Sequence, residues 1–275
     1  STLFVNQSKT RTELDKSNRM IDNGRYTLEV LSGDLRMAGY YGEFVPVAGV
    51  PPIPGSLPDP CSTTPADIAA ALQLAVQGYD AATPTSTISS PPCSLTNTAG
   101  SDLSLKRGSD ILVIRRASTS TPIVQTVALA GTHYIQASLC QFDTVSYIID
   151  TVPANFTLRT RSCTSTSTTP YADLRNFLVH VYFVSPDNNA GDGIPTLKRM
   201  ELDPTTHVFV TTPLVEGIEY MQLEYGLDAD SNGTADSYVA APAVADWPNV
   251  VSVKVNILAR NTEPTAGHTD TKTYS

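Results

Sequence analysis

One polar segment near the C-terminus has the residue types and spacing of a calcium-binding loop. Counted from Asp228, oxygen-bearing side chains occupy loop positions 1, 3, 5 and 9, with Gly233 at position 6. A hard cation such as Ca²⁺ takes about six or more oxygen ligands, and alternating residues on a curling loop converge on one point. The predicted ligands are Asp228, Asp230, Asn232, Thr234 (through its carbonyl) and Asp236.

The loop departs from an EF-hand, because position 12 is Val239 where a bidentate glutamate is required. A second interpretation is a β-hairpin turned at Asn232-Gly233, between strands that end at Tyr225 and start near Tyr238. Acidic side chains held this close repel one another without a cation, which favours calcium. Both interpretations stay open at this level.

The four cysteines predict disulfides rather than a metal centre. They form no Cys-x-x-Cys pair, and no histidine lies at zinc-ligand spacing from them. An even number of cysteines in a chain rich in Ser, Thr and Pro is typical of an oxidising compartment, although four buried thiols are the alternative. The sequential pairing is preferred because each bond closes a locally irregular segment. It joins Cys61 to Cys93 and Cys140 to Cys163.

No motif for catalysis or nucleic-acid binding is present. The sequence lacks the nucleophile elbow, the zinc-protease helix and the phosphate-binding loops, so we do not predict an enzyme. His180 lies within a predicted strand, as a structural or surface histidine does. The net charge of −9 argues against a nucleic-acid partner. A small basic cluster is interpreted as a solvated strand edge: Lys106, Arg107, Arg115 and Arg116.

The first 38 residues predict one long amphipathic helix. Apolar residues recur every seven positions, Pro is absent until Pro46, and Gly39 is a suitable stop. Such a helix would be about 55 Å long, yet no capping box precedes it at Ser1, so we expect that it continues upstream. Its apolar face is predicted to pack on the protein's own sheet and on partner subunits. That face consists of Leu14, Ile21, Leu28, Leu31 and Leu35.

The remaining chain predicts an α+β fold in which helices cover one face of antiparallel sheets. Residues 1–39 are expected to form the helix, 40–109 a Pro-rich connector (40–60) and disulfide-bonded region, and 110–275 a mainly antiparallel β region. A second helix is predicted over 65–79, where Ile68, Leu72 and Val76 follow at four-residue steps. Strands are predicted at 111–114, 123–129, 144–149, 155–158, 177–184, 196–203, 207–211, 217–225 and 250–258.

Three blocks of the sequence resemble the PilW-type minor pilins of type IV pili. Residues 22–42 read DNGRYTLEVLSGDLRMAGYYG and are similar to that family's ENGRFALELLxRDLRMAGYxG signature. Residues 190–197 read AGDGIPTL and resemble its GDGIPTL block. The C-terminal part is similar over DWPNVVSVKV (246–255) and DTKTY (270–274).

This resemblance implies a type IV pilin-like fold and a structural role. It implies a leader upstream of Ser1 that is cleaved off, with methylation at the cleavage site, and an apolar helix between that site and Ser1 that anchors the subunit. This chain would then be a soluble part of a longer subunit. The subunit would sit in the inner membrane and periplasm before assembly and then in the extracellular pilus. Its partners would be other minor and major pilins, with which it helps to initiate the filament, near the tip.

Two alternatives accompany the assembly role. One is a calcium-assisted adhesin whose loops bind a surface ligand, with a polar or aromatic pocket near residues 228–236. The other is a J-type minor pseudopilin of type II secretion, which has a similar long helix. The GDGIPTL-like block and the length of the chain favour the pilus protein.

Overall fold

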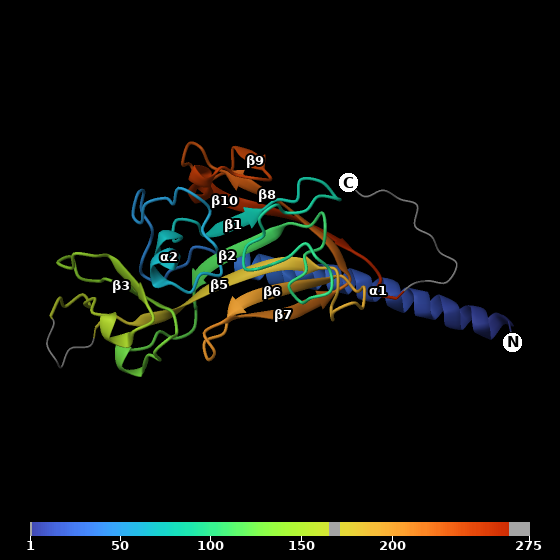
Figure 1. Ribbon diagram of the computed structural model, residues 1–275, viewed down its shortest axis with the longest axis horizontal. Helices are drawn as coiled ribbons and strands as arrows, with labels where there is room; N and C mark the ends of the chain where they lie inside the picture. Colours follow the sequence, from blue (N-terminus) through green and yellow to red (C-terminus); the bar gives the residue numbers. More distant parts are fainter. Residues whose placement is uncertain (1, 165–170, 264–275) are drawn as a thin grey trace.

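The computed structural model describes residues 2–164 and 171–263, with side chains from residue 10 onward. The fold is α+β, with a long N-terminal helix, antiparallel sheets and two disulfides (Figure 1). The elements are α1 (Thr2–Leu35), α2 (Pro65–Ala70), β1 (Val76–Tyr79), β2 (Ile111–Ala117), η1 (Gln125–Val127), β3 (Tyr134–Ala137), β4 (Tyr147–Asp150), η2 (Pro153–Asn155), β5 (Leu174–Ser185), β6 (Thr196–Leu202), β7 (Phe209–Glu216), β8 (Ile218–Leu227), β9 (Ser237–Val239), η3 (Val244–Asn249) and β10 (Val250–Ala259).

β5 is the central strand of the larger sheet. On one side it pairs with β2, and on the other side it pairs first with β3 and then with β6, which pairs with β7. β1 extends the sheet beyond β2, and β4 extends it beyond β3. A smaller sheet has the order β10-β8-β9. All of these pairs are antiparallel, as predicted from the turn spacing.

Both faces of β5 are buried, in two separate cores. Val179, Val181 and Phe183 point into a core that residues from the 40–105 region cover, among them Tyr41 and Leu72. Tyr182 and Val184 point into the opposite core, which α1, β8 and Trp247 close. This alternation follows from the two-residue period of a strand, and it explains why the strand reads as a nearly continuous apolar run.

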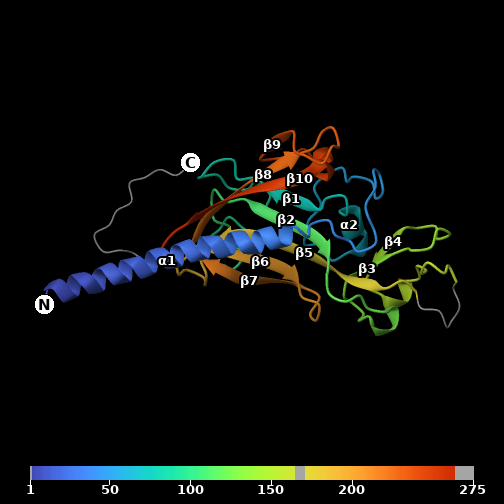
Figure 2. The same cartoon turned by 180° about the vertical axis from the view of Figure 1, so that it is seen from behind.

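The C-terminal part of α1 lies along the sheet, and its N-terminal part projects beyond the body. Figures 1 and 2 show this projection from opposite sides, with β3 and β4 at the far end of the molecule. The helix ends at Leu35, and Gly39 then adopts φ +76° while its N–H donates to the carbonyl of Arg115. The positive φ suits glycine, and the chain then continues beside β2, where the carbonyl of Tyr40 accepts the N–H of Ala117.

The helix predicted over 65–79 is wrong after Ala70. Residues 76–79 form β1 instead, paired with residues 111–114 of β2. The four-residue spacing of apolar side chains was ambiguous over so short a segment. Only glycine fits at position 78 of this strand, because a Cβ there would overlap the Tyr225 side chain from the smaller sheet.

Two predicted strands are also absent. Residues 123–129 form only an isolated bridge at Ile123 and the turn η1, and residues 155–158 follow the turn η2 as a loop around the buried Phe156. β3 was not predicted, because its four residues carry no clear alternation. In this region tertiary packing, rather than local pattern, decides the backbone.

The basic cluster is not a solvated strand edge. β2 is an interior strand, and Arg115 is buried, donating to the carbonyl of Leu74 and to Gln77. Lys106 pairs with Glu219 at 2.5 Å. Burial lowers the pKa of Arg115 to about 10, since a charged guanidinium is less stable away from water. Arg115 and Lys106 therefore serve the fold, whereas Arg107 is exposed.

Candidate functional site

A buried charge network fixes the end of α1 to the middle of the sheet. Asp34, in the last turn, accepts hydrogen bonds from Arg116 of β2 at 2.6 Å and from the Tyr182 hydroxyl of β5 at 2.9 Å. The same carboxylate lies 2.6 Å from Nδ1 of His180, also on β5. The other ring nitrogen of His180 lies 3.3 Å from Glu201 on β6. Two strands therefore bind one helical residue directly, and β6 joins the network through His180.

The electrostatics of the network favour a protonated histidine. Burial alone would lower the pKa of His180, but its hydrogen bonds to Asp34 and Glu201 outweigh that effect and raise it. Burial alone would raise the pKa of Asp34, yet His180 and Arg116 lower it to about 2. Both ring nitrogens face carboxylates, which accept hydrogen bonds only, so the imidazolium satisfies both sides. The prediction of a structural histidine fits this geometry.

The side of α1 that faces the sheet differs from the predicted heptad face. Asn23 donates to the carbonyl of Glu216 on β7 at 2.9 Å, and Gly24 lies against Ala259 of β10. Thr27 and Leu31 are fully buried. Together with Asp34, these residues lie on one side of the helix. Most of them are polar or small, so a search for regularly spaced apolar residues could not identify this side.

The predicted apolar face divides into two parts. Leu31 is 0% exposed and Leu35 packs against the same core. Leu14, Ile21 and Leu28 are 59, 45 and 44% exposed. The expectation that all five pack on the protein's own sheet is therefore wrong for three of them. These three form an exposed stripe on α1, which we call the helix stripe.

The candidate calcium loop joins β8 to β9. Leu227 pairs with Ser237, so the loop connects two antiparallel strands, but residues 228–236 separate these strands and Asn232-Gly233 does not form a two-residue hairpin turn. Asp228 accepts the N–H groups of Asn232 and Gly233, at 3.1 and 2.7 Å. These hydrogen bonds lower the pKa of Asp228, and the bond from the N–H of Gly233 contributes most. Oxygens of Asp228, Asp230 and Asp236 lie within 4.8 Å of one another.

This loop has the oxygen ligands of a cation site. Several of these oxygens already accept hydrogen bonds from groups within the loop. Asn232 accepts the N–H and the hydroxyl of Thr234, and Asp236 accepts the N–H of Ala229. The residues present fit a hard cation in type and proximity. Calcium binding at this loop stays a prediction.

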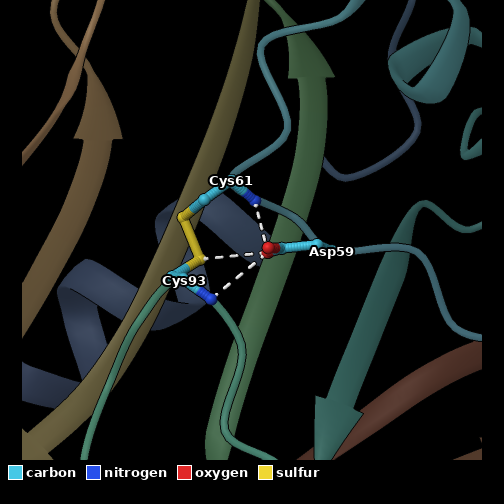
Figure 3. A group of neighbouring side chains, drawn as sticks. All are labelled: Asp59, Cys61 and Cys93. Carbon is cyan, nitrogen blue, oxygen red and sulfur yellow. Dashed lines mark hydrogen bonds between the residues drawn. A yellow bond between two sulfur atoms is a disulfide. The ribbon is translucent and has the colours of Figure 1, made fainter.

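The structure joins Cys61 to Cys93 and Cys140 to Cys163, the pairing preferred from the sequence. Asp59 lies beside the first bond and accepts the N–H groups of both cysteines, at 3.0 and 3.2 Å (Figure 3). The sulfurs are bonded to each other, so these three residues offer no thiolate to a metal. Asp59 instead holds the two loops in place.

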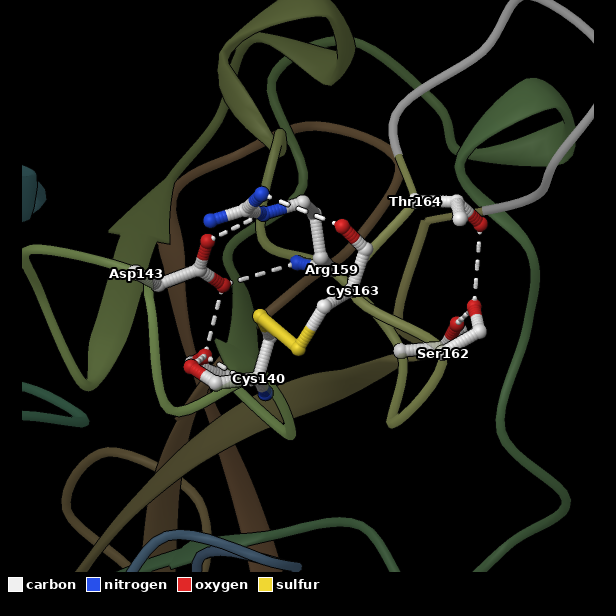
Figure 4. The surroundings of a disulfide bond; sticks show 8 residues. Cys140, Asp143, Arg159, Ser162, Cys163 and Thr164 are labelled. Carbon is white, nitrogen blue, oxygen red and sulfur yellow. Dashed lines mark hydrogen bonds and ion pairs between the residues drawn. A yellow bond between two sulfur atoms is a disulfide. The ribbon is translucent and has the colours of Figure 1, made fainter.

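The second disulfide closes the region beyond β3 and β4. Next to it, Arg159 donates to Asp143 at 2.6 Å and to the carbonyl of Cys163 at 3.2 Å (Figure 4). Asp143 also accepts a hydrogen bond from the hydroxyl of Ser138. The disulfide and the ion pair together fix a segment with little regular structure.

Comparison with known protein families identifies the C-terminal third of the chain. A model described as PilW, the Type IV Pilus-assembly protein W, matches residues 181–275. The resemblance to PilW-type pilus proteins is confirmed. The match covers β6 to β10 and the two later sequence blocks, of which residues 270–274 lie outside the described structure. The block at residues 22–42, which contains Asp34, lies outside the matched range.

The description of this family names type IV pilus assembly, so the match supports a pilus-associated role in general. No curated protein and no solved structure matches the chain. Within the described residues, no helix is long and apolar enough to cross a membrane. The PilW match and the geometry of α1 are thus the two findings on which a function can be built.

Proposed function

We propose that this chain is a minor pilin, a structural subunit that helps to initiate type IV pilus assembly near the filament tip. The helix stripe carries the proposal. It places three large apolar side chains on the outside of a helix that is already anchored to its own domain by Asp34 and Leu31. Apolar surface in contact with water is stabilised by association, at about 25 cal/mol per Å² buried.

The partners in this proposal are other minor and major pilins, which would pack their own helices on the stripe. Before assembly the subunit would be held at the inner membrane by a segment upstream of Ser1, with its body in the periplasm. The disulfides support such a compartment, because structural disulfides persist where the environment is oxidising. The described groups also support a structural role, since His180 is engaged on both ring nitrogens.

The test is complementation of a strain that lacks the gene, with pili counted by electron microscopy. A variant with Leu14→Asp, Ile21→Asp and Leu28→Asp should fold like the wild type and fail to restore pili. The matched control changes the next residue in each case, with Asp15→Asn, Asp22→Asn and Glu29→Gln, all exposed. Normal piliation by a folded, stably expressed stripe variant would refute the proposal.

A further inference from the structure

A groove of about 770 Å³ lies between the smaller sheet and the loop at residues 82–84. Its floor consists of β8 and β10, with Tyr220, Gln222 and Asn256 among the lining residues, and Thr83 and Pro84 belong to its wall. The volume is within the range of about 300–1,000 Å³ that is typical of ligand pockets. None of its lining residues belongs to α1 or to a disulfide, so it is independent of the helix stripe.

Two side-chain amides lie next to each other on the floor of this groove. Gln222 and Asn256 are direct partners across the β8–β10 ladder. Gln222 donates to the carbonyl of Gly108 at 2.6 Å and to Asp110 at 3.3 Å, which fixes its orientation. Among the described residues, neither its carbonyl oxygen nor the exposed Asn256 amide has a protein partner. The pair thus offers both donors and acceptors.

The charges around the groove exclude an anionic ligand. Among the residues that the structure describes, no lysine or arginine lines it, whereas Glu224 does. The nearby Lys254 is engaged by Glu224 at 3.3 Å and lies over the ring of Tyr238. Lys106 lies 5.6 Å from the ring centre of Tyr220 and is paired with Glu219. A carboxylate beside two amides favours a ligand that donates hydrogen bonds and carries no negative charge.

We propose that this groove binds a neutral oligosaccharide. Neighbouring sugar hydroxyls both donate and accept, which matches the adjacent amides of Gln222 and Asn256, and Glu224 accepts further hydroxyl protons. The apolar C–H faces of sugar rings match the ring of Tyr220 and the surface of Pro84. The site lies on the outer face of the smaller sheet, so that it would remain accessible on a subunit held through α1.

The test uses the chain as described, applied to a printed array of neutral, sialylated and sulfated glycans. Titration calorimetry then measures Kd for the neutral oligosaccharide with the strongest signal. We expect binding to neutral glycans, and about a tenfold rise in Kd for Asn256→Ala and for Tyr220→Ala, because each removes contacts worth about one power of ten in affinity. The control Gln141→Ala removes an exposed amide elsewhere and should bind like the wild type.

Three results would overturn this assignment: no neutral glycan binds, only acidic glycans bind, or the groove variants bind as tightly as the Gln141→Ala control. Thermal melting of each variant separates loss of binding from loss of folding. The measurement involves no pilus, so its outcome is independent of the assembly proposal.

Discussion

Asp34 and His180, 146 residues apart in sequence, are 2.6 Å apart and both buried. Asp34 belongs to the last turn of α1, and His180 belongs to the central strand of the larger sheet. One ion pair therefore connects the element that is proposed to meet partner subunits with the strand on which both cores are built.

Replacement of Asp34 by Asn should destabilise the fold by about 3 kcal/mol, because it removes the carboxylate that pairs with Arg116 and leaves buried His180 with Glu201 alone. Urea denaturation followed by circular dichroism measures this difference. Asp22→Asn, on an exposed position of the same helix, should change the free energy of unfolding by less than about 0.5 kcal/mol. Equal stability of the two variants would show that the network is not an anchor.

The network should also impose a pH dependence with two limits. The pKa of Asp34 is about 2 in the folded protein and about 3.9 in the unfolded chain. Asp34 therefore contributes fully to the stability of the fold above about pH 3.9, and this contribution is lost as pH falls toward 2. The pKa of His180 is raised, so its contribution is complete below about 6.5 and is lost as pH rises through the folded-state value.

Denaturation from pH 2.5 to 9 checks both limits. The stability difference between wild type and Asp34→Asn should shrink below about pH 4, and that between wild type and His180→Gln should shrink above about pH 6.5. A pH-independent difference for His180→Gln would mean that the imidazole is neutral in the folded protein.

Leu31 and Leu28 should respond differently to the same truncation. Leu31→Ala opens a cavity in a closed core and should cost about 3 kcal/mol. Leu28→Ala removes an exposed side chain and should change the stability of the isolated chain by less than about 0.5 kcal/mol. Chemical denaturation of both variants measures this. A large loss for Leu28→Ala would place the helix stripe against the body rather than outside it.

Calcium should raise the melting temperature if the hairpin loop binds it. Saturation at about 100 times Kd stabilises a fold by about 2.7 kcal/mol, so scanning calorimetry with calcium and with a chelator should give separate transitions. Asp228→Asn should abolish the shift, whereas Asp173→Asn, an exposed acid elsewhere, should keep it. Identical transitions with and without calcium would leave the loop as a hydrogen-bonded turn.

Elements with a long or regular pattern could be predicted from the sequence. The helix, the paired strands from β5 to β10 and the disulfide pairing follow from spacing, turn residues and cysteine positions. The contacts that position α1 could not be predicted in this way. Asn23 and Asp34 are polar, and they face the sheet because hydrogen-bond partners distant in sequence meet them there. Thr27 is buried beside them, with no hydrogen-bond partner for its hydroxyl among the residues that the structure describes. Hydrophobic periodicity instead selected Leu14 and Ile21, which are exposed.

The polar contacts between α1 and the body also determine how accurately the direction of the helix is set. Asp34 and Asn23 bind the sheet, and Lys16 and Arg19 form ion pairs with Glu263. Asn23 and Asp34 are about 16 Å apart along the helix axis, whereas Thr2 lies about 48 Å from Asp34. With Asp34 as the pivot, a sideways shift of about 1 Å at Asn23 would move the far end by about 3 Å. The hydrogen bond from Asn23 to β7 and the ion pairs of Lys16 and Arg19 with Glu263 are therefore the contacts at which a small change in the body would be converted into a large change in the direction of the helix.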